Sequence, residues 1–327
     1  MRVAIIGAGA LGSYLGYKLN AAGQAVELID SSRRAEQIRK SGVQLQDAIS
    51  GQSLSAEIEV VEAPQDQYDA VIVAVRAQHM KAALELAGKA AGESRNGAEI
   101  LLIGSYVTGM SDWAEALVEE MGQEGVGAER VLFGFPGMSA VLEKNGKLVK
   151  FCERGEDDTE PWGITAGRLR QPVAEGRCGL CRVLSDAGIP VHQAESMEAV
   201  YMSQALVRLP MLAALQYAGG TLKRLSARGD LLKLMIKANR EGLAAVKRSG
   251  LKPVPGSLEM YRWVPIFISA NMIKHRLDTV PSLVGIEAYS RRSIEELRLL
   301  AGQFLEFAVA SGAEFEHLEY VLSGFEE

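Results

Sequence analysis

Three glycines near the start of the chain stand in the spacing G-x-G-x-x-G. They are Gly7, Gly9 and Gly12, within the stretch "AIIGAGALGSYL" of residues 4–15. An apolar run precedes them and a helical pattern follows, which is the context in which such a loop holds a nucleotide pyrophosphate. The first glycine allows a tight turn, the second lets the backbone approach the phosphates, and the third lets the helix pack closely on the sheet. The N–H groups at the start of the helix would then hold the phosphates.

An acidic residue, Asp30, ends the next apolar run, 30 − 12 = 18 positions after Gly12. A carboxylate about 20 positions past such a loop accepts hydrogen bonds from ribose hydroxyls. Its charge would repel the 2′-phosphate of NADP(H), so Asp30 favours NAD(H). The next residues, "SSRR" at positions 31–34, could instead hold that phosphate, or Arg33 and Arg34 could simply form a solvated helix start.

The cofactor-binding residues expected from this pattern are Gly7, Ala8, Gly9, Ala10, Leu11, Gly12 and Asp30.

Cysteine and histidine positions offer other chemistry. Cys178 and Cys181 form a C-x-x-C, which can be a redox couple or half of a zinc site. Zinc would need two more ligands, and by position only Cys152 and His192 could supply them. Because two cysteines at this spacing share one face of a helix, we expect them to be buried packing residues and predict no metal site. Among the histidines, His79 is the best candidate for an acid–base group.

The elements that would position these residues alternate between strand and helix in the first part of the chain. Apolar runs predict strands at residues 3–6, 26–29, 57–61, 70–75, 100–103 and 131–135. Helical patterns at residues 12–22, 80–90 and 111–121 lie between them. This alternation predicts a doubly wound α/β sheet with mostly parallel strands.

The pattern changes along the second part of the chain. Strands at 148–152 and 190–193, with a helix near 173–187, would complete the first domain. Helical patterns follow at 197–217, 230–249, 258–276, 289–311 and 315–322. We therefore expect a Rossmann domain at residues 1–194 and an all-helical domain at residues 195–327. The site should lie in the cleft between them, at the carboxyl ends of the strands.

Composition excludes several classes of partner. The 327 residues carry a net charge of -6, so neither nucleic acid nor an anionic membrane is expected as a partner. No apolar run approaches the ~18 residues of a membrane-spanning helix. Three cysteines in a chain of this length argue for a reducing compartment, and we expect the cytoplasm.

The chain resembles the ketopantoate reductase family over nearly its whole length. The resemblance rests on "IIGAGALGSYL", "VIVAVRAQHM" at 71–80, "LLIGSYVTGM" at 101–110 and "PSLVGIEAYSRRSIEELRLLAGQFLEFAVASG" at 281–312. It implies an NADPH-dependent reduction of a 2-oxo acid to a 2-hydroxy acid, and suggests a homodimer formed through the helical domain.

The resemblance also implies roles for particular residues. Arg76 takes the place of a lysine near the cofactor, and Ser105 that of an asparagine that contacts substrate and nicotinamide. Glu296 matches the family's substrate-binding glutamate.

The first helix of the second domain departs from the family, which has a lysine proton donor there. No lysine occurs from residue 196 to 210. With Pro210 as the anchor of "AVYMSQALVRLPML", Tyr201 takes the lysine's place, although a small shift would put Ser203 there. A tyrosine can donate a proton, and Arg208, two helical turns on, could supply a positive charge or hold a substrate carboxylate. Tyr201 could also be a packing residue, and Glu296 could face solvent.

These observations predict catalytic roles for Tyr201, Glu296, Ser105 and Arg208. The expected activity is hydride transfer between NAD(P)(H) and a small 2-oxo or 2-hydroxy acid or related carbonyl compound. The missing lysine argues against ketopantoate itself as the substrate. The alternative is a catalytically silent NAD(P)-binding sensor or regulatory protein.

Overall fold

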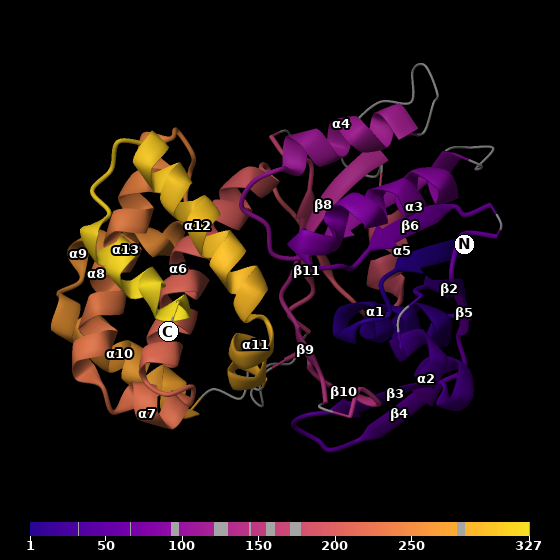
Figure 1. Ribbon diagram of the computed structural model, residues 1–327, viewed down its shortest axis with the longest axis horizontal. Coiled ribbons are helices and arrows are strands. Elements are labelled where there is room, and N and C mark those ends of the chain that lie inside the picture. Colours follow the sequence, from indigo (N-terminus) through magenta and orange to yellow (C-terminus); the bar gives the residue numbers. More distant parts are fainter. Residues whose placement is uncertain are drawn as a thin grey trace. The chain divides into compact units, whose positions relative to one another are not determined.

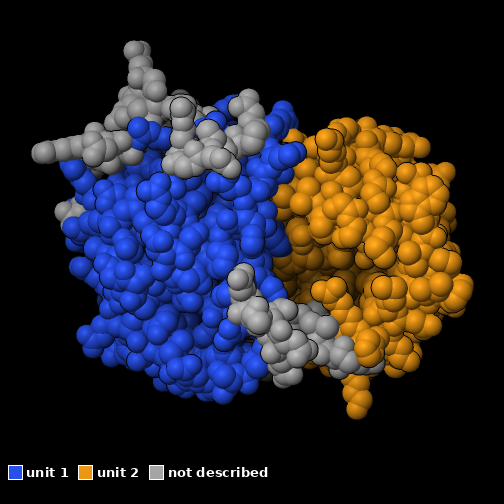
Figure 2. All heavy atoms as spheres, turned by 180° about the vertical axis from the view of Figure 1, so that it is seen from behind, with its two compact units in different colours: residues 1–105, 109–197 blue, residues 106–108, 198–327 orange. Residues whose placement is uncertain are grey.

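The computed structural model describes residues 1–31, 33–65, 67–92, 98–120, 130–143, 145–154, 161–170, 178–279 and 285–326. The chain divides into two compact units, coloured in Figure 2. Unit 1 contains Met1–Ser105 and Gly109–Met197, and unit 2 contains Tyr106–Thr108 and Glu198–Glu327. Residues Tyr106–Thr108 therefore belong to unit 2, although the chain then returns to unit 1 and stays in it up to Met197.

A twisted sheet forms the centre of unit 1 (Figure 1). In the described part of the chain its strands, in spatial order, are β12 (Val191–Gln193), β11 (Ile164–Gly167), β8 (Val131–Pro136), β7 (Glu99–Ile103), β6 (Ala70–Val73), β1 (Arg2–Ile6), β2 (Ala25–Ile29) and β5 (Glu59–Val61).

The strands from β5 to β8 are all parallel, and β11 runs antiparallel to β8. The order β5-β2-β1-β6-β7-β8 is the Rossmann order, with β1 at the centre of the sheet. This confirms the predicted doubly wound α/β fold, followed in the second half of the chain by helices.

Helices cover both faces of the sheet, which explains why its inner strands are almost continuously apolar. Helices α1 (Ala10–Ala21) and α5 (Gly179–Asp186) pack into one core with side chains of the sheet, among them Ile5, Leu28 and Ile72. Helices α3 (Met80–Gly92) and α4 (Met110–Glu120) pack together on the other face (Figure 1). The helix expected near 173–187 begins at Gly179 in the described residues; residues 171–177 lie outside them.

A second sheet packs on α1, with the strand order β4-β3-β10-β9. Its strands are β3 (Val43–Asp47), β4 (Ser53–Ala56), β9 (Ser139–Leu142) and β10 (Leu148–Cys152). Tyr14 of α1 lies against Phe151 of β10, with the ring centroids 5.2 Å apart. Of these strands the sequence pattern predicted only β10, because β3 and β4 are partly polar and β9 has only four residues.

Unit 2 is helical in its described residues, as predicted. Its helices are α6 (Met197–Tyr217), which starts at the end of unit 1, α7 (Leu222–Ser226), α8 (Gly229–Arg248), α9 (Met260–Trp263), α10 (Ile266–Thr279), α11 (Ile286–Arg292), α12 (Ile294–Ala310) and α13 (Glu316–Leu322). Short 3₁₀ turns lie at element ends in both units: η1 (Ala77–His79) in unit 1, and η3 (Gly256–Glu259) and η5 (Ser323–Phe325) in unit 2.

Two of the helices predicted as continuous are interrupted. The pattern at 258–276 breaks at Val264–Pro265, since proline lacks the N–H that an inner helical position needs. The pattern at 289–311 breaks at Ser293, between α11 and α12. Within the described ranges, no helix is long and apolar enough to span a bilayer.

Candidate functional site

The glycine loop joins β1 to α1, and each of its three glycines has a different environment. Gly7 has φ +100°, and an added Cβ would lie 2.9 Å from the carbonyl oxygen of Ala74. A Cβ on Gly12 would lie only 1.9 Å from the carbonyl oxygen of Gly7, so no other residue fits there without moving the backbone. A Cβ on Gly9 would meet no protein atom within 4 Å. Neighbouring protein atoms therefore leave no room for a side chain at Gly7 or Gly12, whereas the space beside Gly9 contains no protein atoms.

The open position is where the Rossmann arrangement brings a pyrophosphate. Gly9 is also the N-cap of α1, so the cap residue has no side chain to accept hydrogen bonds from the first turn of the helix. The N–H groups of Ala10 and Leu11 begin that turn, and the helix dipole favours an anion beside them. The residues present thus fit a dinucleotide: backbone donors, no Cβ at the point of approach, and a position at the carboxyl end of β1.

Asp30 follows β2 at the same edge of the sheet and is tied to the loop. Its Oδ2 accepts a hydrogen bond from the N–H of Ala8 at 2.8 Å, and its own N–H donates to the carbonyl of Val61 at 2.9 Å. These bonds hold the carboxylate beside the glycine loop, where a ribose-binding carboxylate would be required.

Arg34 corrects one expectation for the residues after Asp30. We considered a solvated helix start, but Arg34 is buried and its Nη1 donates to the carbonyls of Gly146, at 2.5 Å, and Lys147, at 3.0 Å. Burial lowers the pKa of its guanidinium, and the charge of Asp30 acts in the opposite direction. Arg34 therefore fixes the β9–β10 turn, while Arg33 is exposed and Ser32 lies outside the described residues.

Two further predicted residues follow neighbouring strands at this edge. Arg76 comes after β6, is exposed, and is the N-cap of η1. Ser105 comes after β7 and is half-buried; the N–H of Gly104 before it donates to the carbonyl of Gly134 at 3.0 Å. The glycine loop, Asp30, Arg76 and Ser105 thus all stand at the carboxyl ends of strands β1, β2, β6 and β7.

The other three predicted catalytic residues lie in unit 2. Tyr201 of α6 is 1% exposed, and its ring meets that of Tyr106 edge to face, with centroids 5.3 Å apart. Glu296 of α12 is 5% exposed and accepts a hydrogen bond from the hydroxyl of Tyr289 at 3.3 Å. The guanidinium of Arg208 lies 6.0 Å from the centroid of the Tyr289 ring.

Within this group, burial and the charge of Glu296 act on Tyr106. The pKa of Tyr106 is raised above its usual value, first by burial and then by the negative charge of Glu296. Its phenol therefore stays protonated and can only act as a neutral group near that carboxylate. Glu296 is buried among aromatic side chains, so the alternative in which it faces solvent is wrong.

Tyr106 and Tyr289 are site residues that the sequence pattern did not single out. The alternative residue Ser203 has a structural contact: its Oγ accepts a hydrogen bond from the N–H of Val254 at 2.9 Å. We call the group Tyr106, Tyr201, Arg208, Tyr289 and Glu296 the tyrosine–glutamate cluster.

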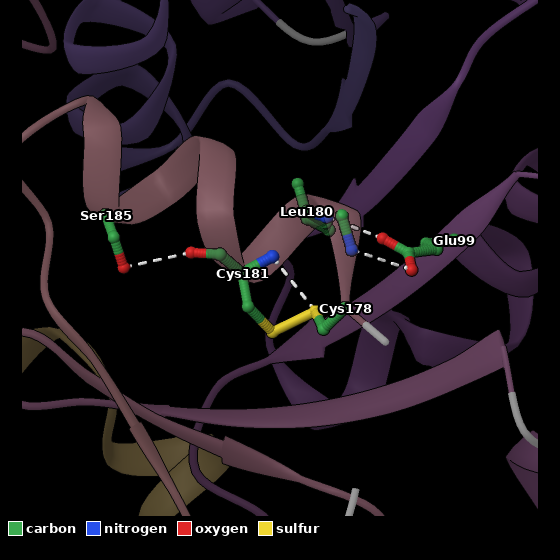
Figure 3. Close-up of a disulfide and its surroundings, with 6 residues drawn as sticks. Glu99, Cys178, Leu180, Cys181 and Ser185 are labelled. Carbon is green, nitrogen blue, oxygen red and sulfur yellow. Dashed lines mark hydrogen bonds between the residues drawn. A yellow bond between two sulfur atoms is a disulfide. The ribbon is translucent and has the colours of Figure 1, made fainter. Parts of the chain in front are cut away.

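The C-x-x-C forms a disulfide between Cys178 and Cys181, at the start of α5 (Figure 3). The prediction of simple packing residues is therefore wrong, because the two cysteines are bonded to each other; Cys178 is 6% exposed and Cys181 is half-buried. Cys152 is a free, buried thiol. The described residues contain no group of three or more metal-binding side chains. The side chain of His79 is exposed after β6.

Comparison with known proteins supports the assignment of the fold. Residues 3–149 match the family model described as Ketopantoate reductase PanE/ApbA. No curated protein sequence matches the chain.

Several solved structures are similar over nearly their whole length. A PanE/ApbA family ketopantoate reductase from Ralstonia eutropha JMP134 is 19% identical, with 100% of this chain and 97% of that chain covered and a TM-score of 0.72. A 2-dehydropantoate 2-reductase from Geobacter metallireducens GS-15 is 19% identical, with 100% and 99% covered and a TM-score of 0.72. A D-mandelate dehydrogenase solved with NADH and anilino(oxo)acetate is 18% identical, with 100% and 97% covered and a TM-score of 0.72. The shared architecture extends through both units.

Proposed function

We propose that this chain, a relative of the ketopantoate reductases whose N-terminal residues match that family, is an NAD(P)-dependent oxidoreductase acting on a small 2-oxo or 2-hydroxy acid or a related carbonyl compound. The observation that carries the proposal is the glycine loop at the centre of the parallel sheet. Gly7 and Gly12 have no room for a side chain, whereas Gly9 opens onto space at a helix N-terminus. A nicotinamide dinucleotide bound there would supply the hydride.

The tyrosine–glutamate cluster is proposed as the part that handles the substrate. Reduction of a carbonyl leaves an alkoxide, which needs a proton donor within hydrogen-bond reach. The Tyr201 hydroxyl takes this role, Glu296 accepts a hydrogen bond from a substrate hydroxyl, and Arg208 holds a substrate carboxylate. Ser105 and Arg76, at the strand ends, contact the nicotinamide side and the cofactor. The ring contact between Tyr201 and Tyr106, and the effect of the Glu296 charge on Tyr106, support this division of roles.

Steady-state kinetics with a panel of 2-oxo acids and both cofactors test the proposal. Replacing Tyr201 by Phe should lower kcat about 10²–10⁴-fold while leaving the dissociation constant of the dinucleotide unchanged. Tyr217→Phe is a matched control, since Tyr217 lies on the same helix and its hydroxyl forms hydrogen bonds with the Ser323 hydroxyl and the carbonyl of Tyr320, away from the cluster. A Tyr201→Phe variant with wild-type kcat would remove Tyr201 from the mechanism.

A second candidate is a dinucleotide-binding sensor without turnover. The absence of lysine from residues 196 to 210 favours it, because the family's proton donor stands there. Titration of NADH and NADPH separates the two candidates when it is combined with the kinetic panel. Tight binding of either dinucleotide with no turnover of any panel compound would support the sensor.

Three finer proposals accompany the function. We propose NAD(H) as the preferred cofactor, supported by the placement of Asp30 beside the glycine loop. We propose the cytoplasm as the compartment, supported by three cysteines in 327 residues. The proposed substrate is a small molecule, and the net charge of -6 supports the absence of a nucleic-acid partner.

We also propose a homodimer, formed through α9 and α10. Five large apolar side chains of these helices are exposed, from Ile268 at 40% to Trp263 at 76%; the others are Met260, Phe267 and Met272. Exposed apolar side chains gathered on two successive helices are typical of a protein–protein interface. Light scattering on Trp263→Glu should show a monomer, whereas Val309→Glu, at an exposed position of α12, should leave the dimer intact. A monomeric wild-type chain would contradict the proposal.

A further inference from the structure

We propose that Cys178 and Cys181 are a redox-active couple that exchanges electrons with a dithiol protein of the thioredoxin class. The proposal goes beyond the hydride-transfer function, because neither cysteine belongs to the dinucleotide loop or the tyrosine–glutamate cluster. It starts from the position of the disulfide: it joins the N-cap of α5 to that helix's first turn.

The two sulfur atoms have different access to solvent. Cys178 is 6% exposed and belongs to the core between α1, α5 and the sheet. Cys181 packs against that core but is only half-buried. An incoming thiolate therefore reaches Sγ of Cys181 first, and Cys178 becomes the leaving group.

The leaving sulfur has a donor already in place. Sγ of Cys178 accepts a hydrogen bond from the N–H of Cys181 at 2.9 Å (Figure 3). That bond would become charge-assisted when Cys178 carries the negative charge, and the N-terminus of α5 favours a thiolate there. The first turn keeps its position because the Ser185 hydroxyl donates to the carbonyl of Cys181 at 3.0 Å.

Glu99 lowers the stability of the Cys178 thiolate. Its carboxylate accepts hydrogen bonds from the N–H groups of Gly179 at 3.0 Å and Leu180 at 2.5 Å. It therefore takes up two of the donors at the start of α5 and places a negative charge in the same turn as the Cys178 sulfur. A nearby like charge disfavours the thiolate, so Glu99 keeps the pair from being reduced more readily.

The exchange balances in two steps. The thiolate of the partner dithiol attacks Sγ of Cys181, the Cys178–Cys181 bond breaks, and its electron pair goes to Sγ of Cys178. The second thiol of the partner then attacks the partner's own sulfur in the mixed disulfide and releases Cys181. The chain gains two electrons and two protons, and the partner dithiol becomes a disulfide.

A purely structural role is a poor fit to this disulfide. It closes a loop with only two residues between the cysteines, so it adds little constraint to the unfolded chain. In the proposed reducing compartment, protein disulfides are mostly transient and serve catalysis or redox sensing.

Thiol counting on the full-length chain tests the redox activity. After incubation at graded ratios of oxidised to reduced glutathione, the protein is denatured, alkylated and weighed. The oxidised chain should carry one adduct, at Cys152, and the reduced chain three. A count that stays at one adduct, or at three, across all ratios would overturn the proposal.

Trapping with a thioredoxin-class protein that lacks its resolving cysteine tests the order of attack. The mixed disulfide should form on Cys181, as peptide mapping would show. Adducts on Cys178, or no adduct at all, would overturn the mechanism. None of these readouts involves nicotinamide turnover, so their failure leaves the proposed oxidoreductase function untouched.

Substitution of Glu99 tests how the couple is tuned. Glu99→Gln should raise the ratio of reduced to oxidised chain by about 3- to 10-fold at a fixed glutathione ratio. Glu99→Asp keeps the charge and should leave the ratio near wild type, which also guards against a variant that merely loosens α5. Glu59→Gln is the matched control, an exposed glutamate that begins β5 as Glu99 begins β7. Equal ratios for Glu99→Gln and Glu59→Gln would refute the role of Glu99.

Discussion

Gly9 and Gly12 lie three residues apart in one loop, yet substitution of Gly9 should affect dinucleotide binding and substitution of Gly12 should affect folding. At Gly9 an added Cβ meets nothing within 4 Å, and the residue has an ordinary φ of -66°. At Gly12 an added Cβ would lie 1.9 Å from the Gly7 carbonyl oxygen, a distance that no relaxation of a side chain can remedy. Gly9→Val should therefore damage binding with little effect on folding, and Gly12→Ala should damage folding.

The magnitudes follow from the groups involved. Valine at a helix N-cap is less favourable than glycine by up to about 1 kcal/mol, and about half or more of that loss is offset by the lower entropy of the unfolded chain. The free energy of unfolding of Gly9→Val should then stay within about 1 kcal/mol of wild type. A side chain at Gly9 would push the pyrophosphate away from about two backbone N–H groups, each worth about 1.5–3 kcal/mol with a charged partner. Dinucleotide affinity should fall at least about 100-fold.

Calorimetric titration with NADH and NADPH, together with urea unfolding, measures both effects on the same samples. Gly12→Ala must move the α1 backbone and should lose about 1–3 kcal/mol or more of unfolding free energy. A folded Gly9→Val variant with unchanged affinity for both dinucleotides would refute the assignment of the loop. A Gly12→Ala variant as stable as wild type would refute the geometry on which the comparison rests.

Three further predictions concern charges and burial in unit 1. Asp30→Asn should raise the affinity for NADPH relative to NADH, as measured by the ratio of their dissociation constants; an unchanged ratio would contradict the proposed preference. Arg34→Ala should lower the free energy of unfolding by about 2–4 kcal/mol, because its buried guanidinium donates to the β9–β10 turn; Arg33→Ala is the exposed control. Burial and a hydrogen bond to Glu27 raise the pKa of Tyr68 to about 12. The protonated Tyr68 therefore adds to the free energy of unfolding below pH ~10, the pKa in the unfolded chain. That contribution is lost as the pH rises through about 12, the pKa in the folded protein. In urea unfolding, Tyr68→Phe should reduce the fall in the free energy of unfolding between pH 10 and about 12. The same dependence on pH in the variant and in wild type would contradict this.

The strands at and beside the glycine loop could be predicted because they are buried on both faces. β1, β2, β6 and β7 are nearly unbroken runs of Val, Ile, Leu and Ala, each with at most one charged residue. The second sheet has one face on α1 and one face partly exposed, so β3 reads "VQLQD", a weaker signal. Its strand β10 also pairs with β3 from a distant part of the sequence, which no local pattern reveals.

The tyrosine–glutamate cluster could not be predicted in full from local sequence patterns. Glu296 looks like any carboxylate in the first turn of an amphipathic helix, and only its burial beside Tyr289 distinguishes it. Tyr106 directly follows Ser105, at the end of β7, yet the chain contributes it to unit 2, where its ring meets Tyr201. One loop after β7 therefore supplies Ser105 to unit 1, which holds the glycine loop, and Tyr106 to the cluster in unit 2. A substitution at Tyr106 should accordingly alter turnover without altering dinucleotide affinity, whereas one at Ser105 should alter both. Equal effects of the two substitutions on dinucleotide binding would show that the loop acts as a single element and that this division of roles is wrong.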